Sequence, residues 1–295
     1  MRSRRLLLPC LLGLLTLFVT VACSGNSDAI RVASKNFAEQ EILGEMYAQV
    51  LEANGYTVER KLNLGATDVA QQALENDEID LYPEYTGTGL LTVLKQPLAT
   101  DSAQVYEAVK SGYAEEFDLV WLEPSPMNNT YALSLTPAGA AKHNITTISE
   151  LVAKADEFTM VGPPEFVARE DGLPGLKAAY GDFELQEFKG VEIGLRYKDP
   201  SEDTVVVGFA TDGQINELDL VVLEDDQNAF PPYQVAPVVQ QQVLDANPEL
   251  AELLNRVTAE VTNAEMQRLN NEVTGNEREP DEVAQEFLTS VGLLE

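Results

Sequence analysis

Two tyrosines and a carboxylate stand close together in residues 80–88, which read Asp-Leu-Tyr-Pro-Glu-Tyr-Thr-Gly-Thr. At the end of an expected strand, this mixture of side chains is more typical of a ligand-binding wall than of a core. Aromatic faces attract cations, and each face contributes about 0.5 to 2 kcal/mol. Tyr82 and Tyr85 are candidates for such faces, although alternation along a strand places them on opposite sides unless a turn intervenes.

A second polar segment, residues 34–40, reads Ser-Lys-Asn-Phe-Ala-Glu-Gln. It follows a short apolar strand expected at residues 30–33 and precedes a helix with apolar residues at 42, 43, 46, 47 and 50. A ligand that also bears a carboxylate needs a guanidinium or ammonium group with hydroxyl or backbone donors, and a helix N-terminus suits that purpose. The two segments therefore offer candidates for both halves of a zwitterion site.

Short apolar runs alternate with amphipathic stretches along the chain. In the first half we expect strands at 30–33 and 57–62 and helices at 39–54 and 68–76, with Gly55 ending the first helix and Thr67 capping the second. A second set of strands is expected at 131–135, 158–161, 205–209, 218–223 and 235–239, followed by helices. This alternation predicts an α/β layer architecture with ligands at the carboxyl ends of the strands. About 270 mature residues fit two lobes.

The N-terminal residues have the pattern of an export signal. Arg2, Arg4 and Arg5 form a positive region before the apolar stretch 6–21, and a cysteine follows at position 23. This pattern predicts a lipoprotein signal peptide at 1–22, a lipid on Cys23 and a flexible tether at 23–28, with plain secretion as the alternative. We therefore expect an extracytoplasmic protein that is held at the membrane by lipid.

Composition excludes several classes of function. The formal net charge of −30 argues against nucleic acid as a partner, because phosphate binding needs a basic surface. The only cysteines are Cys10 and Cys23, so the mature chain has no internal disulfide and no catalytic thiol. His143 is the only histidine, which excludes histidine-rich zinc sites and the usual metalloprotease motif. No metal or cofactor is expected.

From about Ile30 to the C-terminus, these segments resemble the binding proteins of quaternary-amine ABC importers, the ProX-like, OpuC-like and OsmF-like glycine betaine, choline and carnitine family. The resemblance implies a two-lobed periplasmic-binding-protein fold of type II, in which each lobe is a mixed sheet flanked by helices. It also implies that the chain crosses twice between lobes, near Asn128 and near Pro231. Lobe I would then comprise residues 29–128 and 232–295, and lobe II residues 129–231.

The family pattern also suggests ligand-binding residues. It places Tyr131, Phe209 and Tyr233 in an aromatic cage, although many members have tyrosine where Phe209 stands. Betaine-binding members often carry a bulky aromatic residue at Pro83, so Tyr82 or Tyr85 has to supply that wall. For the anion subsite the resemblance suggests Lys35, Thr86 and Arg169, with Arg169 as a bidentate fork. The remaining candidates lie at the rim or behind these groups: Asn129, Glu165, Thr211 and Asp212.

The expected function is that of the extracytoplasmic component of an ABC importer for quaternary-ammonium compatible solutes such as glycine betaine, related betaines or choline. The protein would be a monomer whose lobes close over the ligand and deliver it to a permease with its ATPase. Two alternatives keep the fold: a binding protein for another zwitterion such as an amino acid, and a sensory lipoprotein. A different alternative is a hydrolase that uses Glu84 and Asp212 as paired carboxylates, but no enzyme activity is expected.

Overall fold

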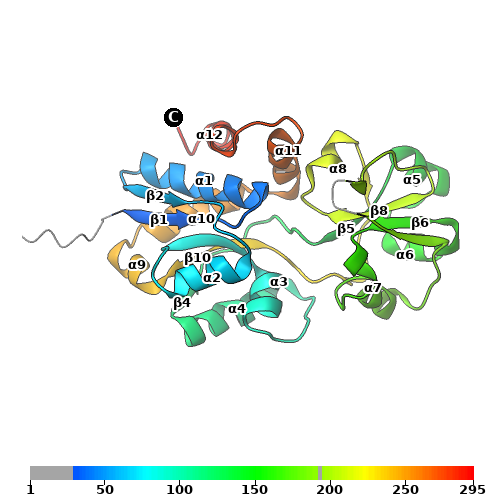
Figure 1. The fold of residues 1–295 in the computed structure, drawn as a ribbon, viewed down its shortest axis with the longest axis horizontal. Helices are drawn as coiled ribbons and strands as arrows, with labels where there is room; N and C mark the ends of the chain where they lie inside the picture. Colours follow the sequence, from blue (N-terminus) through cyan, green and yellow to red (C-terminus); the bar gives the residue numbers. More distant parts are fainter. Residues whose placement is uncertain (1–28, 192–194) are drawn as a thin grey trace, which may run out of the picture.

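The computed structural model describes residues 29–191 and 195–295, which form two lobes (Figure 1). Each lobe is built on a five-stranded mixed sheet with helices on its faces. The predicted α/β class and two-lobed architecture are therefore confirmed. The predicted signal peptide, the tether and Cys23 lie outside the described residues.

Lobe I contains the sheet with strand order β2-β1-β3-β10-β4. Strand β1 is parallel to β2 and β3, whereas β10 is antiparallel to β3 and β4. The strands are β1 (Ile30–Ala33), β2 (Val58–Lys61), β3 (Leu81–Tyr85), β4 (Leu119–Trp121) and β10 (Val235–Gln240). The helices are α1 (Ala38–Ala53), α2 (Thr67–Glu75), α3 (Thr86–Thr88), the π-helical turn η1 (Gly89–Val93), α4 (Ser102–Phe117), α9 (Gln241–Ala246), α10 (Leu250–Glu260), α11 (Asn263–Thr274) and α12 (Pro280–Ser290).

Lobe II repeats this topology with the strand order β7-β6-β8-β5-β9. Strand β6 is parallel to β7 and β8, whereas β5 is antiparallel to β8 and β9. The strands are β5 (Tyr131–Leu135), β6 (Thr159–Gly162), β7 (Glu187–Gly190), β8 (Thr204–Phe209) and β9 (Val221–Val222). The helices are α5 (Pro137–His143), α6 (Ile148–Val152), α7 (Leu173–Tyr180) and α8 (Gly213–Glu217), with 3-10 turns η2 (Ala155–Glu157) and η3 (Pro164–Val167).

The chain passes between the sheets twice, from β4 to β5 and from β9 to β10. The two crossover segments lie side by side: Asn128 and Gln234 form an antiparallel bridge, and the Asn129 N–H donates to the Tyr233 carbonyl at 3.0 Å. The chain therefore returns to lobe I for its last helices. The exact lobe boundaries given in the sequence analysis stay a prediction.

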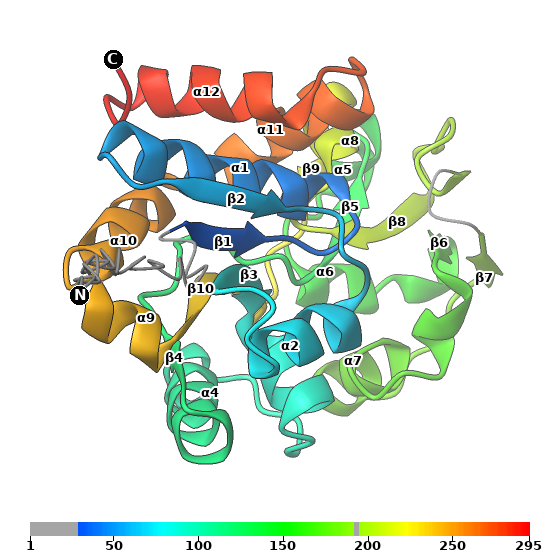
Figure 2. The same ribbon diagram turned by 60° about the vertical axis from the view of Figure 1, so that its left-hand side comes forward.

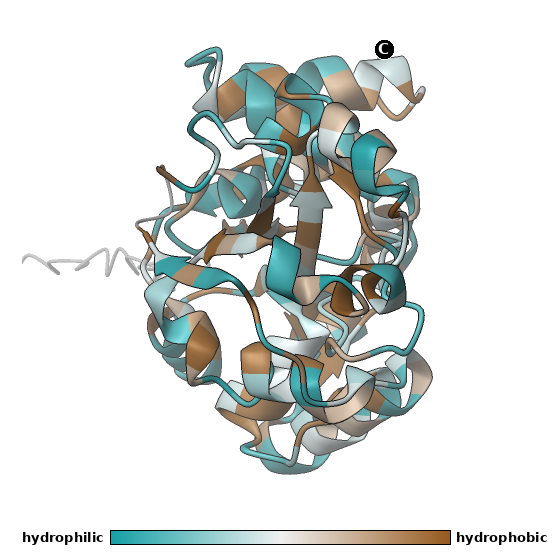
Figure 3. Cartoon of the chain, turned by 90° about the vertical axis from the view of Figure 1, so that its right-hand side faces the viewer, coloured by the Kyte–Doolittle hydropathy of each residue, from teal (hydrophilic) through white to brown (hydrophobic). Residues whose placement is uncertain are grey.

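Helix α1 shows how the C-terminal segment completes lobe I. Its predicted apolar residues Ile42, Leu43, Met46 and Val50 are buried, and the helix packs against α10, α11 and α12. Figure 2 shows α1 between the sheet and α12. In the hydropathy view of Figure 3 the helices alternate hydrophilic and hydrophobic residues, as amphipathic surface helices do.

Some expected boundaries differ from the structure. Gly55 follows α1 with φ of 88°, a left-handed conformation that suits glycine and ends the helix as predicted. Helix α2, however, has Ala66 at its N-cap and no side-chain cap, so the predicted capping by Thr67 is wrong. The strand expected at 218–223 shortens to Val221–Val222, because Leu218 still belongs to the C-terminal cap of α8. Within the described ranges, no helix is long and apolar enough to cross a membrane.

Candidate functional site

A cavity of about 830 Å³ lies between the lobes and takes its lining residues from both. Lobe I contributes the start of α1, the end of β3 and part of α11. Lobe II contributes η3 with the turn after it, the segment around Arg196 and the junction of β8 with α8, and the two crossovers contribute Asn129 and Tyr233. The remaining lining residues come from the starts of α2 and β5 and from α3 and η1. A cavity of this size is typical of small-molecule sites. It is therefore the candidate ligand-binding site.

Aromatic side chains line this cavity from both lobes and from the second crossover. Tyr131 and Phe209 are partners across strands β5 and β8, and their rings stack with centroids 5.2 Å apart. Tyr85, at the end of β3, stacks on Phe37 with centroids 6.3 Å apart. Tyr233 enters from the second crossover. The structure thus brings together the three residues predicted for the cage, and of the two tyrosines proposed for a further wall it places Tyr85 at the cavity, from the opposite lobe.

Three tyrosine hydroxyls at the cavity donate to carboxylates. The pairs are Tyr85 with Glu39 at 2.6 Å, Tyr233 with Asp171 at 3.0 Å and Tyr197 with Asp212 at 2.5 Å. Burial, followed by the adjacent carboxylate, raises the pKa of each of these phenols well above its usual value. The hydroxyls therefore stay protonated and act as donors that fix the position of each ring.

Lys35, predicted for the anion subsite, lines the cavity but is already paired. Its Nζ lies 2.6 Å from Glu84 Oε1, and both side chains are almost completely buried. The same Nζ lies 4.8 Å from the centre of the Tyr85 ring. The Glu84 carboxylate of β3 therefore neutralises the charge of Lys35.

Arg169 is also paired, although it is much more exposed. Its Nε and Nη2 donate to the two oxygens of Asp171 at 2.7 and 2.6 Å, and 45% of its side chain is accessible. Hydrogen bonding to Asp171 raises the pKa of the Arg169 guanidinium. Glu165 lies one helical turn earlier in the chain and is exposed at the rim of the cavity. A ligand carboxylate would therefore have to share Arg169 with Asp171.

Arg196 is a cavity residue that the sequence analysis missed. It is 2% exposed, and its Nη2 lies 2.7 Å from Asp212 Oδ2. Its Nε and Nη1 have no hydrogen-bond partner among the described residues, and its guanidinium carbon lies 5.2 Å from the Phe209 ring centre. Because Arg196 stands outside every recognised motif, no sequence signal marks it. The Phe209 face predicted for the ligand is thus shared with a cation of the protein itself.

Glu39 is another cavity residue that the sequence analysis missed, although it stands inside the motif at 34–40. It is 4% exposed in the first turn of α1, where the helix dipole favours negative charge. It accepts hydrogen bonds from the Tyr85 hydroxyl at 2.6 Å and from the Asn129 and Asn270 amides, each at 2.8 Å. Burial raises the pKa of its carboxyl above the ordinary value. The sequence did contain a signal for this residue: a carboxylate in the first turn of a helix, within a segment that is expected to bind ligand.

Three predicted residues do not line the cavity. Tyr82 is fully buried in a core cluster on the other face of the sheet, as strand alternation relative to Tyr85 requires. Pro83 is buried where it faces Pro237 of β10. The Thr86 hydroxyl donates to the Pro232 carbonyl at 3.2 Å and so ties α3 to the second crossover. The other predicted residues do line the cavity: Lys35, Tyr85, Asn129, Tyr131, Glu165, Arg169, Phe209, Thr211, Asp212 and Tyr233.

The two carboxylates of the hydrolase alternative do not form a pair with each other. Glu84 belongs to β3 of lobe I, where it accepts from Lys35 and from the Tyr82 hydroxyl at 3.1 Å. Asp212 precedes α8 of lobe II and accepts from Arg196 at 2.7 Å. Each carboxylate therefore neutralises a cation of its own lobe.

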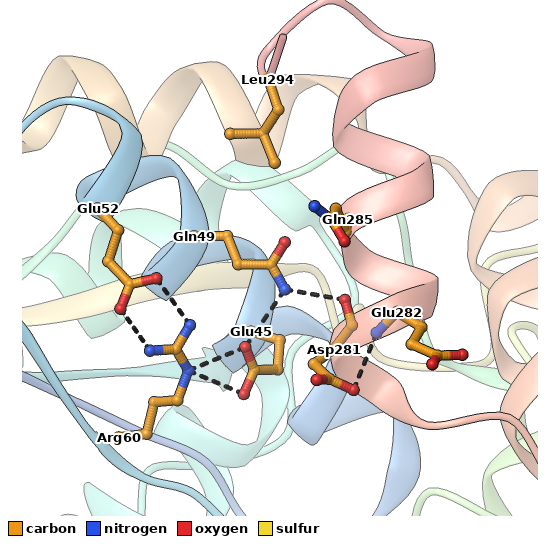
Figure 4. A pocket seen from close by; sticks show the side chains of 8 residues that line it. All are labelled: Glu45, Gln49, Glu52, Arg60, Asp281, Glu282, Gln285 and Leu294. Carbon is orange, nitrogen blue, oxygen red and sulfur yellow. Dashed lines mark hydrogen bonds and ion pairs between the residues drawn. The ribbon is translucent and has the colours of Figure 1, made fainter.

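A second hollow, of about 430 Å³, lies on lobe I between α1, β2 and α12 (Figure 4). Its polar groups bond one another: Arg60 Nε lies 3.0 Å from Glu45 Oε2, and Gln49 Nε2 donates to the Asp281 carbonyl at 2.9 Å. This hollow is lined mainly by polar groups that join α1 to its neighbours. Within the described part of the chain, no group of three or more metal-ligating side chains could hold a metal ion.

Comparison with known proteins gives consistent matches over nearly the whole chain. Residues 28–290 match the family model described as the substrate-binding domain of ABC-type glycine betaine transport systems. The chain is 34% identical to the carnitine transport binding protein OpuCC of Listeria monocytogenes, covering 89% of this chain and 87% of that protein. It is 36% identical to an ergothioneine transport permease/binding protein of Helicobacter pylori, but it spans only 47% of that protein's length.

Solved structures agree with these matches. A crystal structure of a glycine betaine/carnitine/choline ABC transporter protein has a TM-score of 0.85 and 30% sequence identity, covering 90% of this chain and 100% of that chain. A ligand-free structure of YehZ from Escherichia coli has a TM-score of 0.80 and 32% identity, with the same coverage. The two-lobed fold is therefore shared with these proteins.

Proposed function

Because the chain belongs to the family of substrate-binding domains of ABC-type glycine betaine transport systems, we propose that the cavity between its lobes captures a quaternary-ammonium compatible solute and that the protein delivers it to an ABC permease with its ATPase. As the binding protein of such an importer, the chain acts outside the cytoplasm. Lipid on Cys23 would hold it at the membrane.

The observation that carries this proposal is the aromatic lining of a single cavity by both lobes. Tyr85 comes from lobe I, Tyr131 and Phe209 come from lobe II, and Tyr233 comes from the second crossover. Three cation–π contacts of up to about 2 kcal/mol each and one charged hydrogen bond of roughly 2 kcal/mol approach the roughly 8 kcal/mol of a micromolar Kd. A ligand that touches both lobes stabilises their closed arrangement by its differential affinity.

The charged residues favour one place for a ligand carboxylate. Lys35 is buried with Glu84, whereas Arg169 is 45% exposed at the cavity. Of these two, Arg169 is therefore the cation that a carboxylate can reach with less rearrangement. Primary ammonium ligands such as amino acids need several hydrogen-bond acceptors, and the carboxylates of Glu39, Asp171 and Asp212 at the cavity already accept from tyrosine hydroxyls.

Calorimetric titration of the purified protein tests the proposal. Glycine betaine, proline betaine, carnitine and choline are the ligands, with glycine and glutamate as controls. We expect saturable binding of methylated ammonium compounds only, and we expect Tyr233→Ala to weaken it by about tenfold or more, through loss of one aromatic face. Tyr106→Ala is the matched control, because Tyr106 is half-buried on α4 and does not line the cavity. Binding of glycine or glutamate in preference to the methylated compounds would refute the proposal.

A further inference from the structure

The charges around the cavity do not cancel completely. Three cations of the wall each meet one carboxylate, in the pairs Lys35–Glu84 at 2.6 Å, Arg169–Asp171 at 2.6 Å and Arg196–Asp212 at 2.7 Å. Glu39 also lines the cavity and is 4% exposed, but it forms no ion pair with any described residue. It is thus a buried carboxylate that no cation of the described wall neutralises.

The neighbours of Glu39 stabilise its charge without cancelling it. Oε1 accepts from the Tyr85 hydroxyl at 2.6 Å and from Asn129 Nδ2 at 2.8 Å, and Oε2 accepts from Asn270 Nδ2 at 2.8 Å. These donors are neutral and come from β3, the first crossover and α11. The Thr211 hydroxyl also faces the carboxyl group. Hydrogen bonds from neutral donors favour an ionised carboxylate while leaving its full charge to act on the cavity.

Glu39 also acts on an aromatic wall. The Tyr85 hydroxyl that bonds to Glu39 belongs to a ring that lines the cavity. A phenol that donates to a carboxylate is polarised by it, and the ring face, which attracts cations, becomes more negative. The negative charge of Glu39 and its effect on the Tyr85 ring therefore both favour a cationic ligand group.

We propose that Glu39 is a specificity-determining residue, whose unmatched negative charge makes the cavity prefer a permanently cationic ligand group over a neutral group of the same shape. This inference rests on the function proposed above. It differs from a purely structural role, in which Glu39 would only hold β3, the first crossover and α11 together.

The variant Glu39→Gln separates these two roles. Its side-chain oxygen can keep the bonds from Tyr85 and Asn129, while its new N–H group faces Asn270. Asn270 Oδ1 is buried and has no partner within the described ranges, so a flip of that amide supplies an acceptor at the cost of the bond that Nδ2 donates to the Thr211 carbonyl at 2.8 Å. Because an ionised carboxylate buried without a cation is costly, we expect the variant to melt no lower than the wild type. If Glu39 only held β3, the first crossover and α11 together, the substitution would instead lower the melting temperature.

The test measures calorimetric Kd values of the purified protein for choline and for its neutral carbon isostere, 3,3-dimethylbutan-1-ol. We expect Glu39→Gln to raise the Kd for choline by about tenfold and the Kd for the isostere much less, because only choline interacts with the lost charge. Glu41→Gln is the matched control: Glu41 stands in the same helical turn, is partly exposed and does not line the cavity. It should leave the ratio of the two Kd values unchanged.

If Glu39→Gln does not fold, the inference can still be tested on the wild type alone. The same ratio is followed as the pH is lowered, because protonation of Glu39 removes the charge and should reduce the preference for choline. Burial raises the pKa of Glu39, which brings its titration above the ordinary glutamate range. The groups that bond to it are neutral, and the other carboxylates of the cavity wall are those of Glu165, Asp171 and Asp212. A loss of preference that begins at a pH above the ordinary carboxyl range therefore identifies Glu39.

Each outcome of these measurements has one meaning. A fall in the preference for choline, with an unchanged or higher melting temperature, supports the inference. Equal weakening of both ligands in Glu39→Gln, no weakening at all, or a pH-independent ratio would overturn it. If the wild type binds no quaternary ammonium compound, the proposed function itself fails and the inference fails with it.

Discussion

Replacement of Gly87 by alanine tests whether the position of Tyr233 controls ligand binding. Gly87 lies in α3, and a Cβ atom added to it would lie 2.6 Å from Tyr233 Cε1 and 2.7 Å from the Pro232 carbonyl oxygen. Ordinary contacts between carbon atoms are about 3.5 to 4.0 Å. The ring and the second crossover must therefore move by roughly 1 Å to accept the methyl group.

Two energies follow from this displacement. Overpacking of this kind costs about 1 to 3 kcal/mol of folding free energy. The Tyr233 ring supplies one cation–π contact of up to about 2 kcal/mol, and its partial displacement should cost about 1.4 kcal/mol of binding free energy, or tenfold in Kd. The Thr86 hydroxyl, which donates to the Pro232 carbonyl, ties the crossover to α3 and limits how far the strain can relax.

The matched control is Gly139→Ala in lobe II, where the added Cβ would lie 2.5 Å from the Glu202 carbonyl oxygen, and neither residue lines the cavity. Differential scanning calorimetry should show that both variants melt below the wild type. Isothermal titration with the tightest ligand should show a tenfold loss of affinity in Gly87→Ala alone. Wild-type affinity in a destabilised Gly87→Ala variant, or an equal loss in Gly139→Ala, would refute the reasoning.

Two further predictions concern buried charges. Asp212→Asn should lower the free energy of unfolding by about 3 kcal/mol or more, because it leaves the Arg196 guanidinium buried without its carboxylate. In urea unfolding, the double variant Asp212→Asn with Arg196→Met should recover part of this loss. If the losses of the two single variants simply added in the double variant, the pairing would be contradicted. The second prediction concerns pH. The pKa of Glu39 is raised in the folded state, so its contribution to folding stability is favourable at low pH and is lost as the pH rises through that pKa. The melting temperature of Glu39→Gln should therefore exceed that of the wild type by more at pH 7 than at pH 4.5. A constant difference would show that Glu39 does not titrate in this range.

Local sequence patterns predicted much of the fold. Apolar strands alternating with amphipathic helices predicted the α/β layers, and the apolar spacing in α1 identified its buried residues. Alternation along β3 predicted that Tyr82 and Tyr85 lie on opposite sides. It could not predict which of them faces the cavity, because that depends on where the second lobe lies relative to the sheet. The return of the chain to lobe I was expected from the family resemblance rather than from composition.

The charge state of the site depended on contacts between distant segments. Lys35 meets Glu84 across 49 residues, and Glu39 meets Asn270 across 231 residues. Neither pairing follows from spacing along the chain, because each requires two elements to dock in a particular orientation. For this reason the sequence identified Lys35 and Arg169 as cations of the site but could not show that both are already paired with carboxylates.

The sequence by itself therefore determined many of the secondary-structure elements, the family and a part of the cavity lining, because these depend on periodicity and on motifs within single segments. Only the tertiary structure decided which charges cancel, that Arg196 shares the face of Phe209, and that Glu39 is buried without a cation partner among the residues that the structure describes. Those features arise where β3, the crossovers, α11 and lobe II meet, and the physical reason is that electrostatic pairing and desolvation depend on distance in space rather than on distance along the chain.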